Sequence, residues 1–154
     1  MQYRGDLFGM CLRYANSRDE AHDILQEGFI KIFSKLHLYK PLCPVIHWMK
    51  KVMVNTALEH IRKHKKHQQS QYELNEQLID SGFEVGSVQN AAELIELIQR
   101  LPEDYRLVFN LYAIEGYGHK EIGDMLDISE SNSKVRLMRA RNMLQNQLKQ
   151  QMSA

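Results

Sequence analysis

Hydrophobic residues that recur every three or four positions are the feature that most restricts the fold of this 154-residue chain. The spacing runs through residues 19–38 and again from about Val45 to His67, and a shorter stripe precedes residue 19. Each is typical of a helix packed on one face. Pro41 and Pro44 separate the two longer helices, because proline cannot continue a helix. No segment alternates hydrophobic and polar residues convincingly, so a sheet is not expected. The residues expected to face the core are Leu7, Met10, Cys11 and Tyr14, then Ala21, Ile24, Leu25, Phe29, Ile32, Phe33 and Leu36, then Ile46 and Met49 with Val52 or Met53, Thr56 or Ala57, and His60 or Ile61.

A stretch without a single Lys or Arg, from Gln68 to Gln99, divides the chain. Its first part, residues 68–90, is rich in Gln, Ser, Glu and Asn, and its weak periodicity is typical of a linker. Helical spacing returns at Ala91, where a second domain is predicted to begin. The sequence therefore predicts an all-α fold, in which two small helical domains at residues 1–67 and 91–154 are joined by an acidic flexible linker at residues 68–90.

The second domain is predicted to begin with two helices. Pro102 separates them, and proline is favourable in the first turn of a helix. The second of the two is expected over Glu103 to Ile114 and to end at Gly116. Its inward stripe is Tyr105, Val108, Phe109 and Tyr112, and the stripe before it is Leu94, Ile95, Leu97, Ile98 and Leu101.

A helix-turn-helix pattern follows. Gly118 precedes a short helix and Glu121 stands three residues later, as in a capping box. The small Gly123 leaves room for a second helix to cross closely. Asp127 stands in the turn, where Asp tolerates the left-handed conformation better than most residues. Ser129 is a suitable N-cap for the helix that follows. The residues expected to pack at this corner are Ile122, Met125, Leu126 and Ile128.

The last helix is basic on one side. Short polar side chains near the start of such a helix reach base edges, and asparagine suits adenine. The cations that follow can hold phosphates, which positions the helix without reading sequence. The alternative interpretation is an ordinary terminal helix with a solvated basic face. The polar residues are Ser131, Asn132 and Ser133, the cations are Lys134, Arg136, Arg139 and Arg141, and the residues available for packing are Leu137, Met138, Leu144 and Leu148.

Charge is distributed unevenly along the chain, although the net charge is only +1. Residues 1–70 carry 12 Lys and Arg against 6 Asp and Glu, and residues 131–154 carry 5 against none. The residues between these blocks are acidic on balance. Two basic ends indicate two places that contact nucleic acid.

The first of these places is the basic run from His60 to His67. Trp48, Lys50, Lys51 and Asn55 precede it on the same predicted helix. Cations mixed with an aromatic ring and an amide suit a DNA strand whose bases are partly unstacked. The alternative is a charged helix end that faces water, with Trp48 in the core.

Three histidines in this run allow a rival interpretation, because His60, His64 and His67 share a helix face at a spacing found in metal sites. Four flanking cations oppose a metal ion and no acidic ligand is expected nearby, so no metal site is expected. Enzyme signatures such as a Gly-rich phosphate loop or a nucleophile elbow are absent, so neither catalysis nor a cofactor is expected. Two cysteines without a C-x-x-C motif, and no hydrophobic run of membrane length, favour a cytoplasmic protein.

Several motifs together carry a family resemblance. Residues 20–30, EAHDILQEGFI, are similar to a region-two motif of bacterial sigma factors, and Trp48, Asn55 and Arg62-Lys63 fall at that region's Trp, Asn and Arg-Lys signature. The region-four matches are Leu101-Pro102, Tyr105-Arg106, Gly116-Tyr117, Glu121-Ile122 and Ser129 to Arg141. With both regions present in order over nearly the whole chain, the sequence resembles the extracytoplasmic-function (ECF) sigma factors of RNA polymerase.

The resemblance implies a promoter-specificity subunit with three sets of contacts. The first domain would dock on core RNA polymerase through Asp23, Gln26, Glu27 and Phe29. The melted DNA strand would be captured by Trp48, Asn55, Arg62 and Lys63. The upstream promoter element would be read by Ser131, Asn132, Lys134, Val135, Arg136 and Arg139. The implied partners are core RNA polymerase, promoter DNA as duplex and as melted strand, and an anti-sigma factor, without stable insertion into a membrane.

Two other hypotheses compete with this one. A stand-alone helix-turn-helix regulator would bind DNA tightly and specifically without polymerase. A helical interaction protein would bind a partner and no DNA, and Arg139→Glu would then leave any DNA-dependent activity unchanged.

Overall fold

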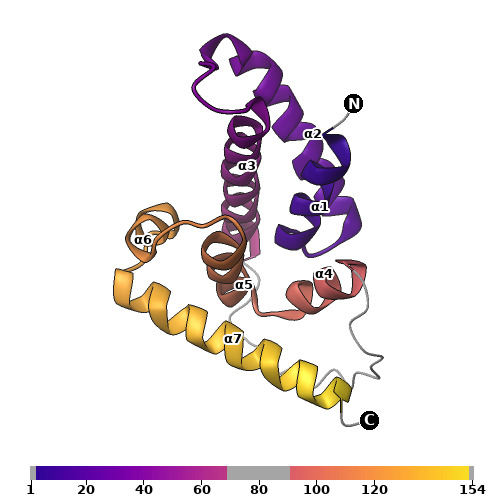
Figure 1. The fold of residues 1–154 in the computed structure, drawn as a ribbon, viewed down its shortest axis with the longest axis vertical. Coiled ribbons are helices and arrows are strands. Elements are labelled where there is room, and N and C mark those ends of the chain that lie inside the picture. Colours follow the sequence, from indigo (N-terminus) through magenta and orange to yellow (C-terminus); the bar gives the residue numbers. More distant parts are fainter. Residues whose placement is uncertain (1–2, 69–90, 153–154) are drawn as a thin grey trace. The chain divides into compact units, whose positions relative to one another are not determined.

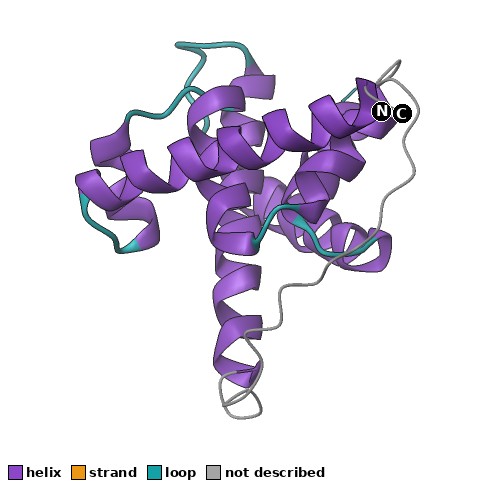
Figure 2. Ribbon diagram, turned by 90° about the horizontal axis from the view of Figure 1, so that it is seen from below, coloured by secondary structure: helices purple, strands orange, loops and turns teal. Residues whose placement is uncertain are grey.

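The computed structural model describes residues 3–68 and 91–152, and all regular secondary structure in these two ranges is helical (Figure 2). Contacts divide the chain into two compact units, residues 1–80 and residues 81–154, called here the N-terminal and C-terminal units. The all-α fold predicted from the hydrophobic spacing is confirmed. The predicted linker lies outside the described residues except for Gln68, so its character stays a prediction.

Three long helices form the N-terminal unit: α1 (Arg4–Tyr14), α2 (Arg18–Lys35) and α3 (Val45–Gln68), with the short 3₁₀ helix η1 (Leu36–Leu38) after α2. The helices α1, α2 and α3 pack side by side (Figure 1). The start of α2 is capped twice. Ser17 Oγ accepts a hydrogen bond from the Glu20 N–H (3.1 Å), and the Glu20 carboxylate accepts one from the Asn16 N–H (2.8 Å). Such reciprocal capping pairs backbone donors that an exposed helix start would otherwise leave free.

The core of the N-terminal unit follows most of the stripes predicted from the sequence, although Phe29, Ile46 and Met49 are only half-buried. The predicted residues of α1 and the first part of α2 are buried, and the alternatives on α3 resolve with Met53, Thr56, Ala57, His60 and Ile61 all buried. Helices α2 and α3 approach closely at Gly28, where a Cβ atom would overlap the thioether of Met53.

Phe33 and Leu36 were expected in this core, and that expectation is wrong. Their side chains are 59% and 49% exposed. Phe33 lies about 100° around the helix from the buried Ile32. This places it beyond the stripe of α2 that α1 and α3 cover. The end of α2 therefore presents hydrophobic side chains to its surroundings.

The C-terminal unit consists of α4 (Ala91–Arg100), α5 (Glu103–Phe109), the π-helical turn η2 (Asn110–Ile114), α6 (His119–Leu126) and α7 (Glu130–Met152). Its core joins α4, α5 and α7 through Leu97, Leu101, Ala140 and Leu144, with Tyr105, Phe109 and Met143 packed against them. Three residues predicted to pack, Leu94, Met138 and Leu148, are instead 47%, 56% and 38% exposed, because each lies beside the buried stripe of its helix.

The helix predicted over residues 103–114 changes type at Asn110. The Glu115 N–H bonds to the Asn110 carbonyl five residues back (2.9 Å), which is the π-helical pattern. The wider turn shifts the helix face, so Asn110 and Leu111 are buried while Tyr112, which a 3.6-residue period placed inward, is half-buried. Gly116 then ends the segment with φ +82°, as its position in the sequence predicted.

Candidate nucleic-acid interface

The corner between α6 and α7 has the local geometry predicted for a helix-turn-helix. Glu121 Oε2 accepts a hydrogen bond from the Gly118 N–H (2.9 Å) at the start of α6. Asp127 ends α6 in the left-handed region with φ 56°. Ser129 Oγ then accepts from the Asn132 N–H (3.0 Å), which caps α7. These bonds orient α7 relative to its supporting helix.

Gly123 allows the close approach at this corner. A Cβ atom there would lie 2.7 Å from the carbonyl oxygen of Ile128 and 3.6 Å from the nitrogen of Glu130. The obstacle is backbone, which cannot rotate away. The turn therefore requires glycine at this position, as its small size suggested.

Most of the predicted DNA-reading residues lie on the exposed face of α7. Ser131, Asn132, Lys134, Val135 and Arg139 are exposed, within the first three turns of the helix. Their shared exposure on one element gives a surface with short polar groups at its start and cations further along, the arrangement expected of a helix that enters a DNA groove.

Two of the predicted cations also have partners within the C-terminal unit. Arg136 Nη1 lies 3.8 Å from Asp104 Oδ1 on α5, and the Arg136 side chain is only 21% exposed. Arg139 Nη1 donates a hydrogen bond to Tyr105 Oη (3.3 Å). Both contacts bind α7 to α5, so these arginines orient the helix as well as adding positive charge to it.

The sequence did not predict a row of contacts among Ser133, His119, Tyr112 and Arg141, called here the polar stack. Ser133, taken there as one of the exposed polar residues, is buried, and its Oγ lies 2.9 Å from His119 Nδ1. The His119 ring stacks on Tyr112 (ring centroids 4.4 Å apart), and the Arg141 guanidinium lies 5.7 Å from the centre of the Tyr112 ring. Partial burial, and then the charge of Lys134, lower the pKa of His119. The stack joins η2, α6 and α7, a relation that no local sequence pattern encodes.

A second candidate surface runs along α3. Trp48, Asn55 and Arg62 stand seven residues apart, so they share one helix face, and Lys63 adjoins it. Asn55, Arg62 and Lys63 are exposed, whereas Trp48 is half-buried with its ring centroid 5.7 Å from that of Tyr39. Trp48 is therefore neither a fully buried core residue nor a free surface ring, and one side of it remains accessible.

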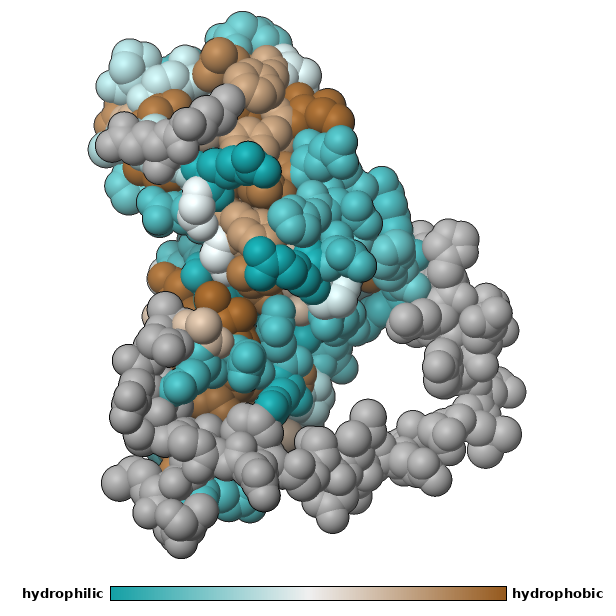
Figure 3. Space-filling view, turned by 90° about the vertical axis from the view of Figure 1, so that its right-hand side faces the viewer, coloured by the Kyte–Doolittle hydropathy of each residue, from teal (hydrophilic) through white to brown (hydrophobic). Residues whose placement is uncertain are grey.

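Helix α2 carries the four residues that the resemblance assigns to polymerase. Asp23 and Gln26 are exposed and Phe29 is half-buried. Gln26 and Phe29 line a groove whose other walls are Arg4, His22, Leu25, Ile30 and Phe33. Ile30 is 64% exposed, and hydrophobic side chains of this kind interrupt the hydrophilic surface in Figure 3. Neither Ile30 nor Phe33 was predicted to line a binding surface, and Phe33 was predicted to lie in the core.

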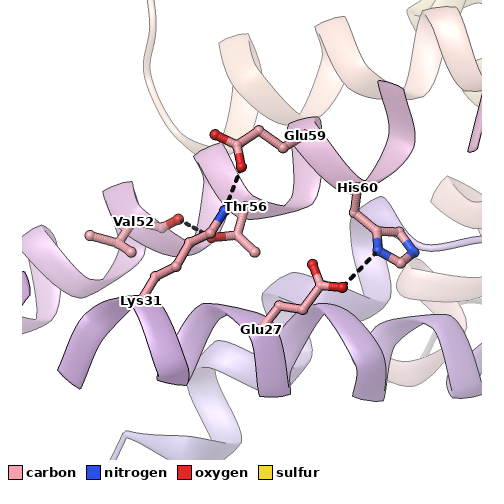
Figure 4. A network of polar contacts seen from close by, with 6 residues as sticks. All are labelled: Glu27, Lys31, Val52, Thr56, Glu59 and His60. Carbon is pink, nitrogen blue, oxygen red and sulfur yellow. Dashed lines mark hydrogen bonds and ion pairs between the residues drawn. The ribbon is translucent and has the colours of Figure 1, made fainter. Parts of the chain in front are cut away.

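Glu27, the fourth residue of this set, faces α3 instead of the groove. Its Oε1 lies 3.6 Å from Nδ1 of the buried His60 (Figure 4). One turn further along α2, Lys31 forms an ion pair with Glu59 of α3. These contacts place Glu27 at the α2–α3 boundary, separate from Gln26 and Phe29.

The expectation that no acidic ligand lies near the histidines of α3 is wrong. Folding brings the start of α2 to the far part of α3, so that Glu20, His60 and His64 each offer a ligand atom within 4.8 Å of the others. The third histidine of the predicted set, His67, belongs to the part of α3 whose side chains are not described.

Within the described residues, α-helices of sufficient length are too polar to cross a lipid bilayer. This agrees with the absence of a long hydrophobic run in the sequence.

Comparison with known proteins identifies both units. The family model for sigma-70 region 2 matches residues 1–67, and the model for sigma-70 region 4 matches residues 91–144. The ECF RNA polymerase sigma factor SigM of Bacillus subtilis (strain 168) is 31% identical over 149 residues, which cover 92% of this chain and 88% of the relative. The ECF RNA polymerase sigma-E factor of Haemophilus influenzae is 25% identical, with 96% of this chain and 84% of the relative covered.

A solved structure shows the same fold. The sigma factor RpoE, crystallised with the anti-sigma factor NepR from Bartonella quintana, superposes with a TM-score of 0.61 at 20% identity, covering 96% of this chain and 92% of that one. Taken with the helix-turn-helix geometry of α6 and α7, these matches show that the chain belongs to the family of ECF RNA polymerase sigma factors.

Proposed function

We propose that this chain binds core RNA polymerase in the cytoplasm, directs it to a promoter and helps to melt the DNA, without catalysis of its own. Two observations together carry the proposal. Both sigma regions match in order along the chain, and each unit has one helix with exposed polar and basic residues. The stand-alone regulator is less well supported, because it leaves the entire N-terminal unit without a role.

Upstream duplex DNA is the proposed partner of α7. Ser131 and Asn132 stand at the start of the helix, where short side chains can reach base edges in the major groove. Lys134 and Arg139 are exposed one and two turns later and would contact phosphates on either side of the groove. Val135 lies between them and can contact a thymine methyl group.

Melted DNA is the proposed partner of α3. Asn55 and Arg62 share an exposed face, on which the amide can bond to a base and the guanidinium to the backbone. Trp48, half-buried against Tyr39, offers a supported ring for stacking. A stacked base contributes about 1–3 kcal/mol in other single-strand binding proteins. Lys63 adds charge at the end of this face.

Core polymerase is the proposed partner of the groove on α2. Asp23 and Gln26 offer polar contacts, while Phe29 and its exposed neighbours offer hydrophobic area in the same place. Glu27 would take part from the edge of this surface. An anti-sigma factor that covers these residues would keep the chain from polymerase, and one solved structure of similar fold is the complex of the sigma factor RpoE with the anti-sigma factor NepR.

Transcription in vitro with core polymerase tests the proposal. Adding the wild-type chain should create new start sites on genomic fragments, and Asn132→Ala should change which fragments are used, with discrimination shifted by about 1–3 kcal/mol. Gln145→Ala, at an exposed position between three and four turns further along α7, is the matched control. Failure to create any start site would overturn the proposal. Tight, specific binding of the free chain to duplex DNA without polymerase would favour the stand-alone regulator.

A further inference from the structure

His60 is buried between two carboxylates. Its Nε2 lies 3.6 Å from Glu20 Oε1, its Nδ1 lies 3.6 Å from Glu27 Oε1 (Figure 4), and the residue is 7% exposed. The Nε2 atom has no hydrogen-bond partner within the described residues. A buried polar atom of this kind requires an explanation, because leaving it unpaired costs about 1–3 kcal/mol.

A neutral imidazole cannot serve both carboxylates. It carries one N–H, and when Nδ1 directs that N–H toward Glu27, the lone pair of Nε2 faces an oxygen of Glu20. Two electron pairs facing each other repel. A cation between Nε2 and Glu20 Oε1 removes this repulsion, and that cation is either a proton or a metal ion.

A third group distinguishes the two cations. The ring of His64, one helical turn along α3, lies against His60 with 4.3 Å between ring centroids, and one of its nitrogens falls within the 4.8 Å cluster. A proton between Nε2 and Glu20 needs only one acceptor, whereas a metal ion takes up further ligand atoms such as the nitrogen of His64. Convergence of two imidazoles and a carboxylate is the arrangement of a transition-metal site, and two histidines with one glutamate are an established zinc ligand set.

We propose that Glu20, His60 and His64 bind one Zn²⁺ ion between the start of α2 and the far part of α3. Glu27 then acts from outside the ligand set, because a small shift from 3.6 Å would let it accept the Nδ1–H of His60 and fix the ring with Nε2 toward the metal. Metal-binding histidines commonly donate their second ring N–H to a carboxylate in this way.

The site needs little rearrangement. Two ligand atoms of a tetrahedral zinc site stand about 3.3 Å apart, given bond lengths of about 2.0 Å, and the Glu20–His60 pair is already at 3.6 Å. Glu20 is held in place by its other oxygen, Oε2, which accepts the Asn16 N–H. His64 is exposed and can rotate to complete the set.

Helix geometry separates two neighbouring cations from the cluster. Arg62 and Lys65 fall on other sides of α3, since neither is three or four residues from either histidine. Lys63 stands closer and interacts electrostatically with Glu59. The carboxylates of Glu20 and Glu27 supply negative charge at the site itself. The proposed ion would therefore join two segments 40 residues apart in the sequence and rigidify the part of α3 that carries Arg62 and Lys63.

Binding of Zn²⁺ to the full chain, freed of metal with a chelator, tests this proposal by competition with a chromogenic zinc dye. We expect one equivalent to bind, with a rise in the thermal unfolding midpoint. His64→Ala, at an exposed position, and Glu20→Gln, which keeps an oxygen for the Asn16 N–H, should each weaken binding about 100-fold. His47→Ala, an exposed histidine at the start of α3, should leave the affinity unchanged.

Circular dichroism of both variants without metal establishes that they fold, so a lost affinity reports the ligand and not the fold. Dissociation constants weaker than about 10 μM for the wild type, or equal for the wild type and His64→Ala, would overturn the proposal. The readout involves neither polymerase nor DNA, so its result is separate from that of the transcription assay.

Discussion

The guanidinium of Arg136 on α7 lies 3.8 Å from the carboxylate of Asp104 on α5. A residue that the sequence assigns to the DNA interface is thus already paired within its own unit. Lys134, one turn into α7, forms an ion pair at 3.8 Å with the exposed Glu130, one turn back along the same helix. Exposed pairs of this kind are weak and easily exchanged for phosphate. The two cations should therefore contribute differently to DNA binding.

Salt dependence of promoter affinity separates the two roles. Lys134→Ala should lower the slope of log affinity against log salt by about one unit, because one phosphate contact is lost. Arg136→Ala should lower it by less, since part of the Arg136 charge is compensated by Asp104, and should also destabilise the contact between α5 and α7. Asp104→Asn is the control, because it releases Arg136 and should increase affinity at low salt. Equal slopes for the two alanine variants would contradict this distinction.

Replacing glycine by alanine should reduce stability by different amounts at Gly123 and Gly28. Gly123→Ala should destabilise the C-terminal unit by about 1–3 kcal/mol, because the new methyl group meets the Ile128 carbonyl. Gly28→Ala should cost less, since the obstacle is the flexible end of Met53, and alanine gains about 1 kcal/mol in helix propensity. Urea unfolding followed by circular dichroism measures both. A larger loss for Gly28→Ala would show that the α2–α3 contact is the more rigid one.

The two cysteines should differ greatly in reactivity. Burial raises the pKa of the Cys11 thiol to about 12 from 9.0, against a smaller opposing effect of Arg13, so the folded protein holds about 1000-fold less Cys11 thiolate than the unfolded chain near neutral pH. Cys43 is exposed. An aromatic disulfide reagent should label one thiol quickly and the second only on unfolding, and Cys43→Ser should abolish the fast phase. A fast phase that persists in Cys43→Ser would contradict the burial of Cys11.

Acid should weaken the link between α2 and α3. The hydrogen bond from Lys31 lowers the pKa of Glu59 below its ordinary 4.5, more than desolvation raises it. Because the folded-state pKa is the lower one, the stabilisation is fully present above about pH 4.5 and is lost as the pH falls through the folded-state value. The stability difference between the wild type and Glu59→Gln should be constant from pH 7 to pH 5 and shrink below that. High salt should reduce it throughout, since Glu59 is half exposed.

Features that depend on neighbours in sequence were predictable in this chain. The glycine and glutamate that cap α6, the left-handed Asp127 and the serine that caps α7 all act within four residues. Their geometry follows from backbone rules alone. The same holds for the buried stripes of α1 and of most of α2.

Features that depend on tertiary packing were not predictable. Arg106 is 1% exposed and donates a hydrogen bond to the Gln99 carbonyl (3.0 Å), although its residue type favours the surface. Phe33 is exposed because, among the described residues of its unit, no helix covers that side of α2. The proximity of Glu20 to His60 arises from the pairing of two helices across 40 residues, so a search for ligands near in sequence could not find it.

The π-helical turn at Asn110–Ile114 determines how this segment should respond to a change in its length. Such a turn accommodates one residue more than an α-helix would over the same rise. A one-residue deletion between Phe109 and Gly116 would therefore remove the extra residue and let an ordinary α-helix cover the same rise, so Gly116 and the helices after it would keep their direction. The same deletion in the regular helix α5 would rotate everything that follows by about 100°. A deletion in this turn is therefore expected to be much less damaging than a deletion in α5.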